Sequence, residues 1–387
     1  MQEKTSRISV GVLGLLLVSI FTFTRCSTDV DLTAEYKSIP IVFGILDAAV
    51  DTQWVSINRT WLGDGDQTVA AMVADSSEYA PDRIQAQMVE VIGADDDGIG
   101  GIDARVFELH DTLLQTKDEN GIFFAPEHIA YFTRTTNNNG TKLDPDADYR
   151  FELVIDDTTE VEAMTNMIGV TAGNIIQPPP VVDNIKLGFA NVGSTNVTYP
   201  PYNFRWSSTP GAARYQAVLV VHYVEHYWAD DYQTVLDSSR SKSLEISIGS
   251  VDPNNDDGGQ PMSKVFPGNS FFSQLGSRLE KNVRITRELG FWDEVSQISR
   301  AFDFLLIVAN EELAIYLDIN APVTNIILER PEYTNIDGGL GLWASRTTQG
   351  VYGLGYTTDT IEHLQEGDDT AELNFCTPTP WSDYACP

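Results

Sequence analysis

The chain has 387 residues, a hydrophobic fraction of 42% and a formal net charge of -32, from 24 basic and 56 acidic residues. This length suffices for two folded domains, and this hydrophobic content excludes a wholly disordered chain. The negative charge repels phosphate backbones and anionic headgroups, which argues against nucleic acid as a partner; its simplest explanation is solubility.

The N-terminal segment has the pattern of an export signal. Two basic residues precede an apolar run at 10–21 that is too short to cross a bilayer comfortably. Cys26 follows and resembles a lipoprotein processing site, where the thiol is acylated after cleavage, although Arg25 replaces the usual small residue. We therefore expect a signal peptide over 1–25 and lipidation of Cys26. The alternatives are an ordinary secretory signal with an incidental cysteine and an uncleaved N-terminal anchor.

Residues 26–38 form the expected lipidated tether, which is polar and acidic. Its acidic residues resemble the export signal of Bacteroidota surface lipoproteins. This resemblance implies a lipid-anchored protein of the outer membrane, on the cell surface or alternatively on the periplasmic face.

The segment 39–176 has the pattern of an N-terminal β-sandwich. Residues 53–61 alternate with a period of two, which places Val55, Ile57 and Trp61 on one face of a half-buried strand. Gly- and Asp-rich turns separate further short apolar runs, as expected for antiparallel strands. The predicted strands are 39–46, 53–61, 83–92, 104–114, 122–133 and 149–155, with a short helix at 68–76.

A Pro-rich linker at 177–180 is the predicted domain boundary. The following segment, 181–330, resembles a fibronectin type III domain, because Trp206 on one strand is followed by a turn and a strand that begins at Tyr215. Both residues are expected in the core of this second antiparallel sandwich. A partly helical insertion is expected near 269–299. A further short helix is predicted with Asn310 as its N-cap.

The last segment, 331–387, is predicted to contain C-terminal strands and a disulfide loop. After Cys26 only Cys376 and Cys386 remain, and an exported protein meets an oxidising compartment, so the two should be bonded. The residues at 329–336 and 338–346 resemble the C-terminal signature of uncharacterised Bacteroidota outer-membrane lipoproteins. That family carries a domain of unknown function and is associated with nutrient uptake. The resemblance implies a location at the outer membrane and a transporter as neighbour, and it transfers no functional residues.

One motif has the spacing of a zinc site. His222-Tyr-Val-Glu-His226 matches H-x-x-E-H, which binds zinc when the two histidines share a helix face. The surrounding Val- and Tyr-rich residues instead predict a strand, on which the histidines are about 13 Å apart and Glu225 points to the opposite face. We therefore expect no zinc site and no other cofactor.

Acidic loops are the other candidate for metal binding, since calcium prefers oxygen ligands. The best of them begins like an EF-hand loop but carries Ser263 where the bidentate glutamate belongs, so a solvated turn is the favoured interpretation. The weak candidate ligands are Asp252, Asn254 and Asp256.

The sequence thus predicts a mostly β protein of two antiparallel sandwiches that acts as a non-enzymatic binding or scaffolding lipoprotein, accessory to an outer-membrane transporter. A hydrolase with an interdomain pocket and a structural adhesin are the alternatives. Neighbouring aromatic residues indicate either a sugar- or peptide-binding face or ordinary packing. These aromatic residues are Tyr227, Trp228 and Tyr232.

Overall fold

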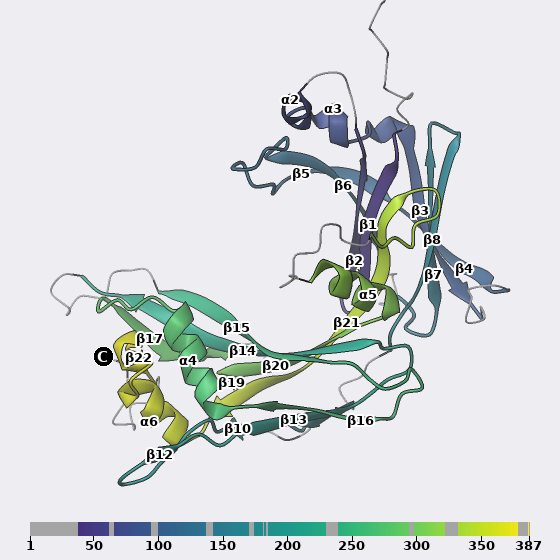
Figure 1. Cartoon of the computed structure of the whole chain (residues 1–387). Coiled ribbons are helices and arrows are strands. Elements are labelled where there is room, and N and C mark those ends of the chain that lie inside the picture. The colour runs from purple at the N-terminus through teal and green to yellow at the C-terminus, as the bar shows by residue number, and fades with distance from the viewer. Residues whose placement is uncertain are drawn as a thin grey trace, which may run out of the picture.

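The computed structural model describes residues 38–61, 66–93, 100–136, 142–169, 174–180, 182, 185–229, 239–293, 298–321, 332–377 and 386. Cys26 and the predicted signal peptide lie outside these residues. Figure 1 shows two β-rich units, the first in purple and blue and the second in teal to yellow. The prediction of a mostly β fold with several sheets is confirmed.

The first unit contains two facing sheets. One carries β1 (Pro40–Asp47), β2 (Thr52–Arg59), β6 (Glu127–Arg134) and β5 (His110–Gln115), in that order. The other carries β4 (Ile102–Glu108), β3 (Ile84–Ile92), β7 (Asp148–Ile155) and β8 (Thr159–Asn166). Short helical turns occupy the predicted helical region and the residues after it: α2 (Gln67–Ala71), α3 (Ala74–Ser77) and η1 (Pro81–Arg83).

The alternation in β2 buries the expected side chains with one exception. Val55 and Ile57 are 2% and 1% exposed and pack in the core between the two sheets. The expectation that Trp61 shares this face is wrong, because β2 ends at Arg59 and the Trp61 side chain is 39% exposed.

The predicted strand at 104–114 is in fact two strands that belong to different sheets. Only Leu109 separates β4 from β5, and its N–H donates to the carbonyl of Ala86 on β3 at 3.0 Å. The chain therefore crosses from one face of the sandwich to the other at this residue. Local alternation continues through the crossing, so the sequence pattern did not reveal it.

The second unit is built around the long strand β14 (Arg214–Tyr227), which pairs with β15 (Arg240–Val251) on one edge. Its other edge pairs with β17 (Ile285–Leu289) and then β20 (Phe302–Ala309). Facing them is a three-stranded sheet of β16 (Pro261–Phe266), β13 (Tyr202–Ser207) and β9 (Ile175–Gln177). The predicted linker 177–180 thus begins inside β9.

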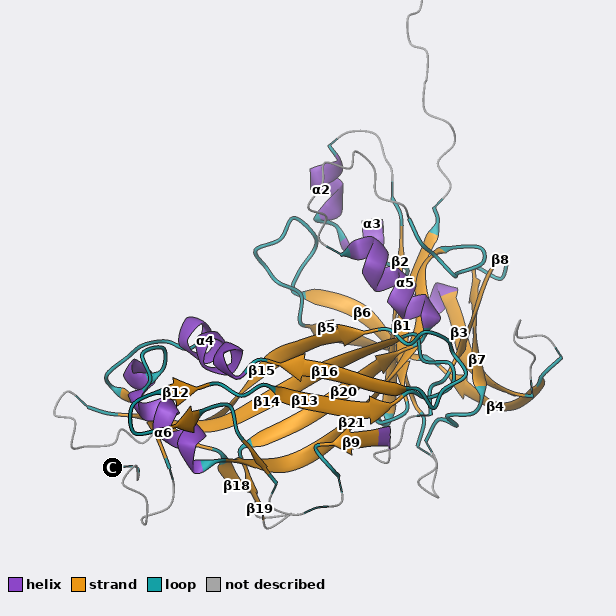
Figure 2. Cartoon of the chain, turned by 60° about the horizontal axis from the view of Figure 1, so that its bottom comes forward, coloured by secondary structure: helices purple, strands orange, loops and turns teal. Residues whose placement is uncertain are grey.

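Smaller elements complete this unit. The predicted helical insertion contains one helix, α4 (Gly268–Arg278), followed by strands, and Asn310 caps α5 (Glu311–Asn320) as expected. Figure 2 shows α6 at the end of the second unit, away from the first. The remaining elements are β10 (Lys186–Leu187), β11 (Asn191–Val192), β12 (Val197–Thr198), β18 (Phe291–Asp293), β19 (Ile298–Arg300), α6 (Thr358–Glu366), η3 (Ala371–Leu373) and β22 (Phe375–Cys376).

Strand β21 (Leu340–Tyr356) belongs to both units. Its first half pairs in parallel with β1, from Ile41 opposite Leu340 to Asp47 opposite Arg346. Its second half pairs antiparallel with β20. The result is one 11-stranded sheet that runs through the whole molecule, with yellow-green β21 beside purple β1 in Figure 1.

The predicted aromatic core of the second unit is confirmed. Trp206 and Tyr215 are both 0% exposed, and their ring centroids lie 5.9 Å apart. Phe204 stacks on Phe304 across the two sheets at 4.6 Å. The fibronectin type III-like topology stays a prediction.

Replacing Trp206 tests this core. Truncation of a fully buried aromatic leaves a cavity, so Trp206→Ala should lower the free energy of unfolding by about 3–5 kcal/mol. Because β21 joins the units, thermal unfolding should remain one cooperative transition at a lower temperature. The matched control is Trp54→Ala on β2, whose side chain is 46% exposed and should matter little. Equal destabilisation by both substitutions would contradict the core assignment.

Candidate functional site

An open groove lies in the first unit where β4 passes into β5. Its volume is about 590 Å³, within the range typical of ligand sites. It lies between the end of β4 and the end of β6. The lining residues are Val106, Phe107, Glu108, His110, Phe132, Thr133 and Arg134.

The wall formed by β4 presents backbone groups that have no strand partner. Leu109 bonds to Ala86 on β3, and the direction of backbone groups alternates along a strand. The N–H and C=O of Val106 and Glu108 therefore point away from β3. No other described strand pairs with this edge of β4.

The opposite wall is the end of β6. Thr135 donates its N–H to Asp51, so Arg134, one residue earlier, turns its backbone groups away from β2. The β5–β6 ladder stops at the pair of His110 and Phe132. The backbone of Arg134 thus faces the groove without a ladder partner. The groove is a split between two strand edges.

Aromatic rings and charged side chains flank this split. The rings of Trp54 and Phe132 lie 5.3 Å apart, and His110 contacts Phe132 edge-on at 6.3 Å. Arg134 is exposed and forms no ion pair with any residue that the structure describes. Such a mixture of rings and hydrogen-bonding groups suits ligand binding. None of these residues was singled out from the sequence, because the split depends on where distant strands separate.

The H-x-x-E-H motif lies on β14, which confirms the predicted strand. His222 and His226 engage different carboxylates, with Nε2 of each 2.8 Å from Asp303 and Glu288 respectively. Glu225 lies on the opposite face, where it is 3% exposed. The strand therefore does not bring the motif together as a ligand set.

Glu225 instead forms a buried ion pair. Arg287, which is 1% exposed, donates Nε to Glu225 at 3.1 Å and its other nitrogens to backbone carbonyls of Leu373 and Glu280. Burial alone would raise the pKa of Glu225, but hydrogen bonds from Lys242 and Tyr227 and the Arg287 charge outweigh it and lower the pKa. With these partners the cluster is satisfied internally and has a structural role.

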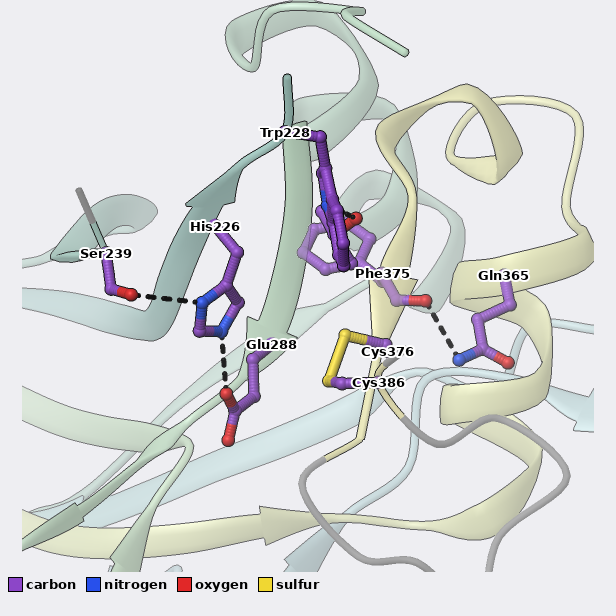
Figure 3. Close-up of a disulfide and its surroundings, with 9 residues drawn as sticks. His226, Trp228, Ser239, Glu288, Gln365, Phe375, Cys376 and Cys386 are labelled. Atoms are coloured by element: carbon purple, nitrogen blue, oxygen red, sulfur yellow. Dashed lines mark hydrogen bonds and ion pairs between the residues drawn. A yellow bond between two sulfur atoms is a disulfide. The ribbon is translucent and has the colours of Figure 1, made fainter. Parts of the chain in front are cut away.

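The expected disulfide fits the structure. The sulfur atoms of Cys376 and Cys386 are 2.13 Å apart, and Figure 3 shows the bond beside the strand that carries Glu288. Trp228 is 9% exposed and donates its indole N–H to Thr286, so it serves packing rather than a binding face. Tyr232 lies outside the described residues.

Of the weak calcium candidates, Asp252 is engaged through its side chain, and Asn254 and Asp256 through their backbone. Both carboxylate oxygens of Asp252 accept hydrogen bonds from Arg214 at 2.8 Å. Asn254 donates its backbone N–H to Gln260, and the carbonyl of Asp256 accepts from Gly211. Within the described ranges, no cluster of three or more His, Cys, Asp or Glu side chains has metal-binding geometry.

A polar cluster lies where the two units meet. Asn310 is 0% exposed; its Oδ1 accepts from Ser345 and Leu313, and its Nδ2 donates to Thr165 at 2.7 Å. Glu312, in the first turn of α5, has a buried Oε2 without a hydrogen-bond partner in the described part of the chain. Burial raises the pKa of Glu312, and the neighbouring charges of Glu311 and Asp148 raise it further.

Sequence comparison with known proteins identifies no relative. No protein-family model matches the sequence, and no curated protein matches it significantly. None of the helices in the described ranges has the length and apolar character needed to cross a membrane.

The raised pKa of Glu312 predicts a pH-dependent effect on stability. Above the carboxyl group's ordinary pKa of 4.5, the charged form is disfavoured in the folded state, so Glu312→Gln should raise the midpoint of thermal unfolding at pH 7–8. The gain should vanish as the pH falls below 4.5, where the carboxyl is protonated in both states. Glu311→Gln removes the same charge from an exposed neighbour and should show no such gain. An equal gain in both variants would indicate relief of overall charge repulsion instead.

Proposed function

We propose that the protein is a non-enzymatic binding component of the cell envelope and that its ligand occupies the groove between β4 and β6. The observation that carries this proposal is the split itself. Backbone groups of Val106, Glu108 and Arg134 face an open space of about 590 Å³ beside Phe132 and Trp54. These are hydrogen-bonding and apolar groups presented together, as in ligand sites.

The proposed cellular location rests on the N-terminal residues. The short apolar run followed by Cys26 supports a lipid anchor, and the acidic tether supports the surface of the outer membrane of a bacterium of the Bacteroidota. In this arrangement the second unit, a fibronectin type III-like scaffold, supports the first. A nutrient transporter of the same membrane is the proposed partner.

The anchor is tested by Cys26→Ser. Without an acylated thiol the protein should move from the membrane fraction to the soluble fraction, or its maturation should stop. Thr33→Ala, within the same tether, serves as the control and should leave the protein in the membrane fraction. Retention of the Cys26→Ser protein would refute the lipid anchor.

The groove is tested by titrating the full chain with two probe sets, a heptapeptide that alternates valine and threonine between terminal lysines, and a series of neutral oligosaccharides. At least one probe should bind, and Arg134→Ala should weaken its binding tenfold or more by removing a groove contact. Lys186→Ala removes an equal charge from exposed β10 in the second unit and should leave binding unchanged. If no probe binds, or if both variants bind as the unchanged protein does, the assignment of function to the groove fails.

A further inference from the structure

We propose that the ligand of the groove is an extended peptide that adds as a strand to the free edge of β4. This inference rests on the proposed function and specifies its ligand class. The peptide lies along Val106–Glu108, with Phe132 and Arg134 forming the opposite wall. Recognition by strand addition uses main-chain hydrogen bonds for affinity and alternate side chains for specificity.

The backbone of β4 supplies the required hydrogen bonds. The N–H and C=O groups of Val106 and Glu108 point into the groove, so they offer two donors and two acceptors at the spacing of a strand edge. A sugar uses hydroxyl groups at varied angles, whereas this regular alternation of donors and acceptors matches another polypeptide backbone. The unpaired backbone groups of Arg134 lie across the groove on β6.

The exposed side chains of β4 indicate which peptides fit. Ile102 and Val106 are 75% and 56% exposed, and Ala104 between them is also exposed. A β-bulge at Ala104 shifts the register with β3, so Val106, opposite Val89, and Ile102, opposite Ile92, lie on opposite faces of the edge strand. An added strand along Val106–Glu108 places a side chain directly beside exposed Val106, where β-branched partners pack best. The net charge of -32 disfavours acidic peptides.

Two other strand edges of the molecule, those of β15 and β8, are covered by hydrogen bonds, unlike the edge of β4. On β15 the outward carbonyls of Glu245 and Ser250 accept hydrogen bonds from the side chains of Arg278 and Lys264.

On β8, Glu162 exchanges two backbone hydrogen bonds with Asp337, at 2.8 and 3.1 Å. Natural proteins block strand edges in such ways to prevent unwanted pairing. In the described chain, no comparable cover lies over Val106 and Glu108. An exposed apolar side chain, Val106, on an open strand edge suits a strand-binding site.

A proline at Val106 tests the proposal directly. It removes the outward N–H without breaking a bond to β3, so the fold should survive while peptide binding is blocked. The alternating heptapeptide should bind the Val106→Pro chain at least tenfold more weakly than the unchanged chain. The same peptide with N-methyl groups on alternate residues should bind the unchanged chain at least tenfold more weakly, and this measurement depends on no variant.

Val265→Pro provides a matched control. Val265 is 54% exposed on β16, which is an edge strand. Pro261 on the same strand already occupies a position whose backbone nitrogen points away from β13, and Val265 occupies another such position. Its substitution should leave peptide binding unchanged, and circular dichroism should show both proline variants folded.

The remaining outcomes separate the two proposals. Binding of the oligosaccharides alone, or equal binding of the N-methylated peptide, would overturn strand addition and leave the groove as the ligand site. A concentration-dependent dimer that Val106→Pro abolishes would assign the edge to a second copy of the chain and overturn the peptide. No binding by any probe would refute both the ligand class and the proposed function.

Discussion

The fully buried side chain of Asn310 holds together the three elements on which the architecture depends. Its amide oxygen caps α5 and accepts from the backbone of β21, while its amide nitrogen donates to Thr165 on β8. One short side chain thus links the helix, the strand that both units share and the edge of the first sandwich. A buried amide whose hydrogen bonds are satisfied stabilises the fold. Replacing it would leave its buried partners without hydrogen bonds. The two units are consequently joined by a specific polar contact as well as by β21.

The strand edges of the first unit differ in what lies beside them. Around β21 and β8 the edges end in hydrogen bonds to neighbouring backbone, as between Glu162 and Asp337. At the far side of the first sandwich the chain crosses between sheets at Leu109, and the crossing separates β4 from β6. The groove is therefore a geometric consequence of how this sandwich closes. The groove forms without any special side chain, and its walls consist of ordinary strand residues.

Local patterns were sufficient to predict many elements of the fold. Period-two alternation located the strand with Val55 and Ile57, the strand character of the histidine motif, and the core positions of Trp206 and Tyr215. The pairing of β1 with β21 was beyond such reasoning, because residues about 300 positions apart leave no periodic signal. The crossing at Leu109 was not predicted for a related reason. The alternation of apolar and polar residues does not show which sheet a strand joins. The candidate groove could not be predicted, because it consists of backbone groups left without partners.

The parallel pairing of β1 with β21 also constrains how the chain acquires its structure. β1 is among the first strands made, yet one of its edges stays open until Leu340–Arg346 arrives. Contacts between such distant residues slow folding, since the long intervening loop must close before the pairing is gained. The proposed export of the chain in an unfolded state is compatible with this order, because the first sandwich cannot complete its sheet before Leu340–Arg346 is made. The same order means that a fragment ending before residue 340 keeps a bare strand edge at β1, which invites aggregation.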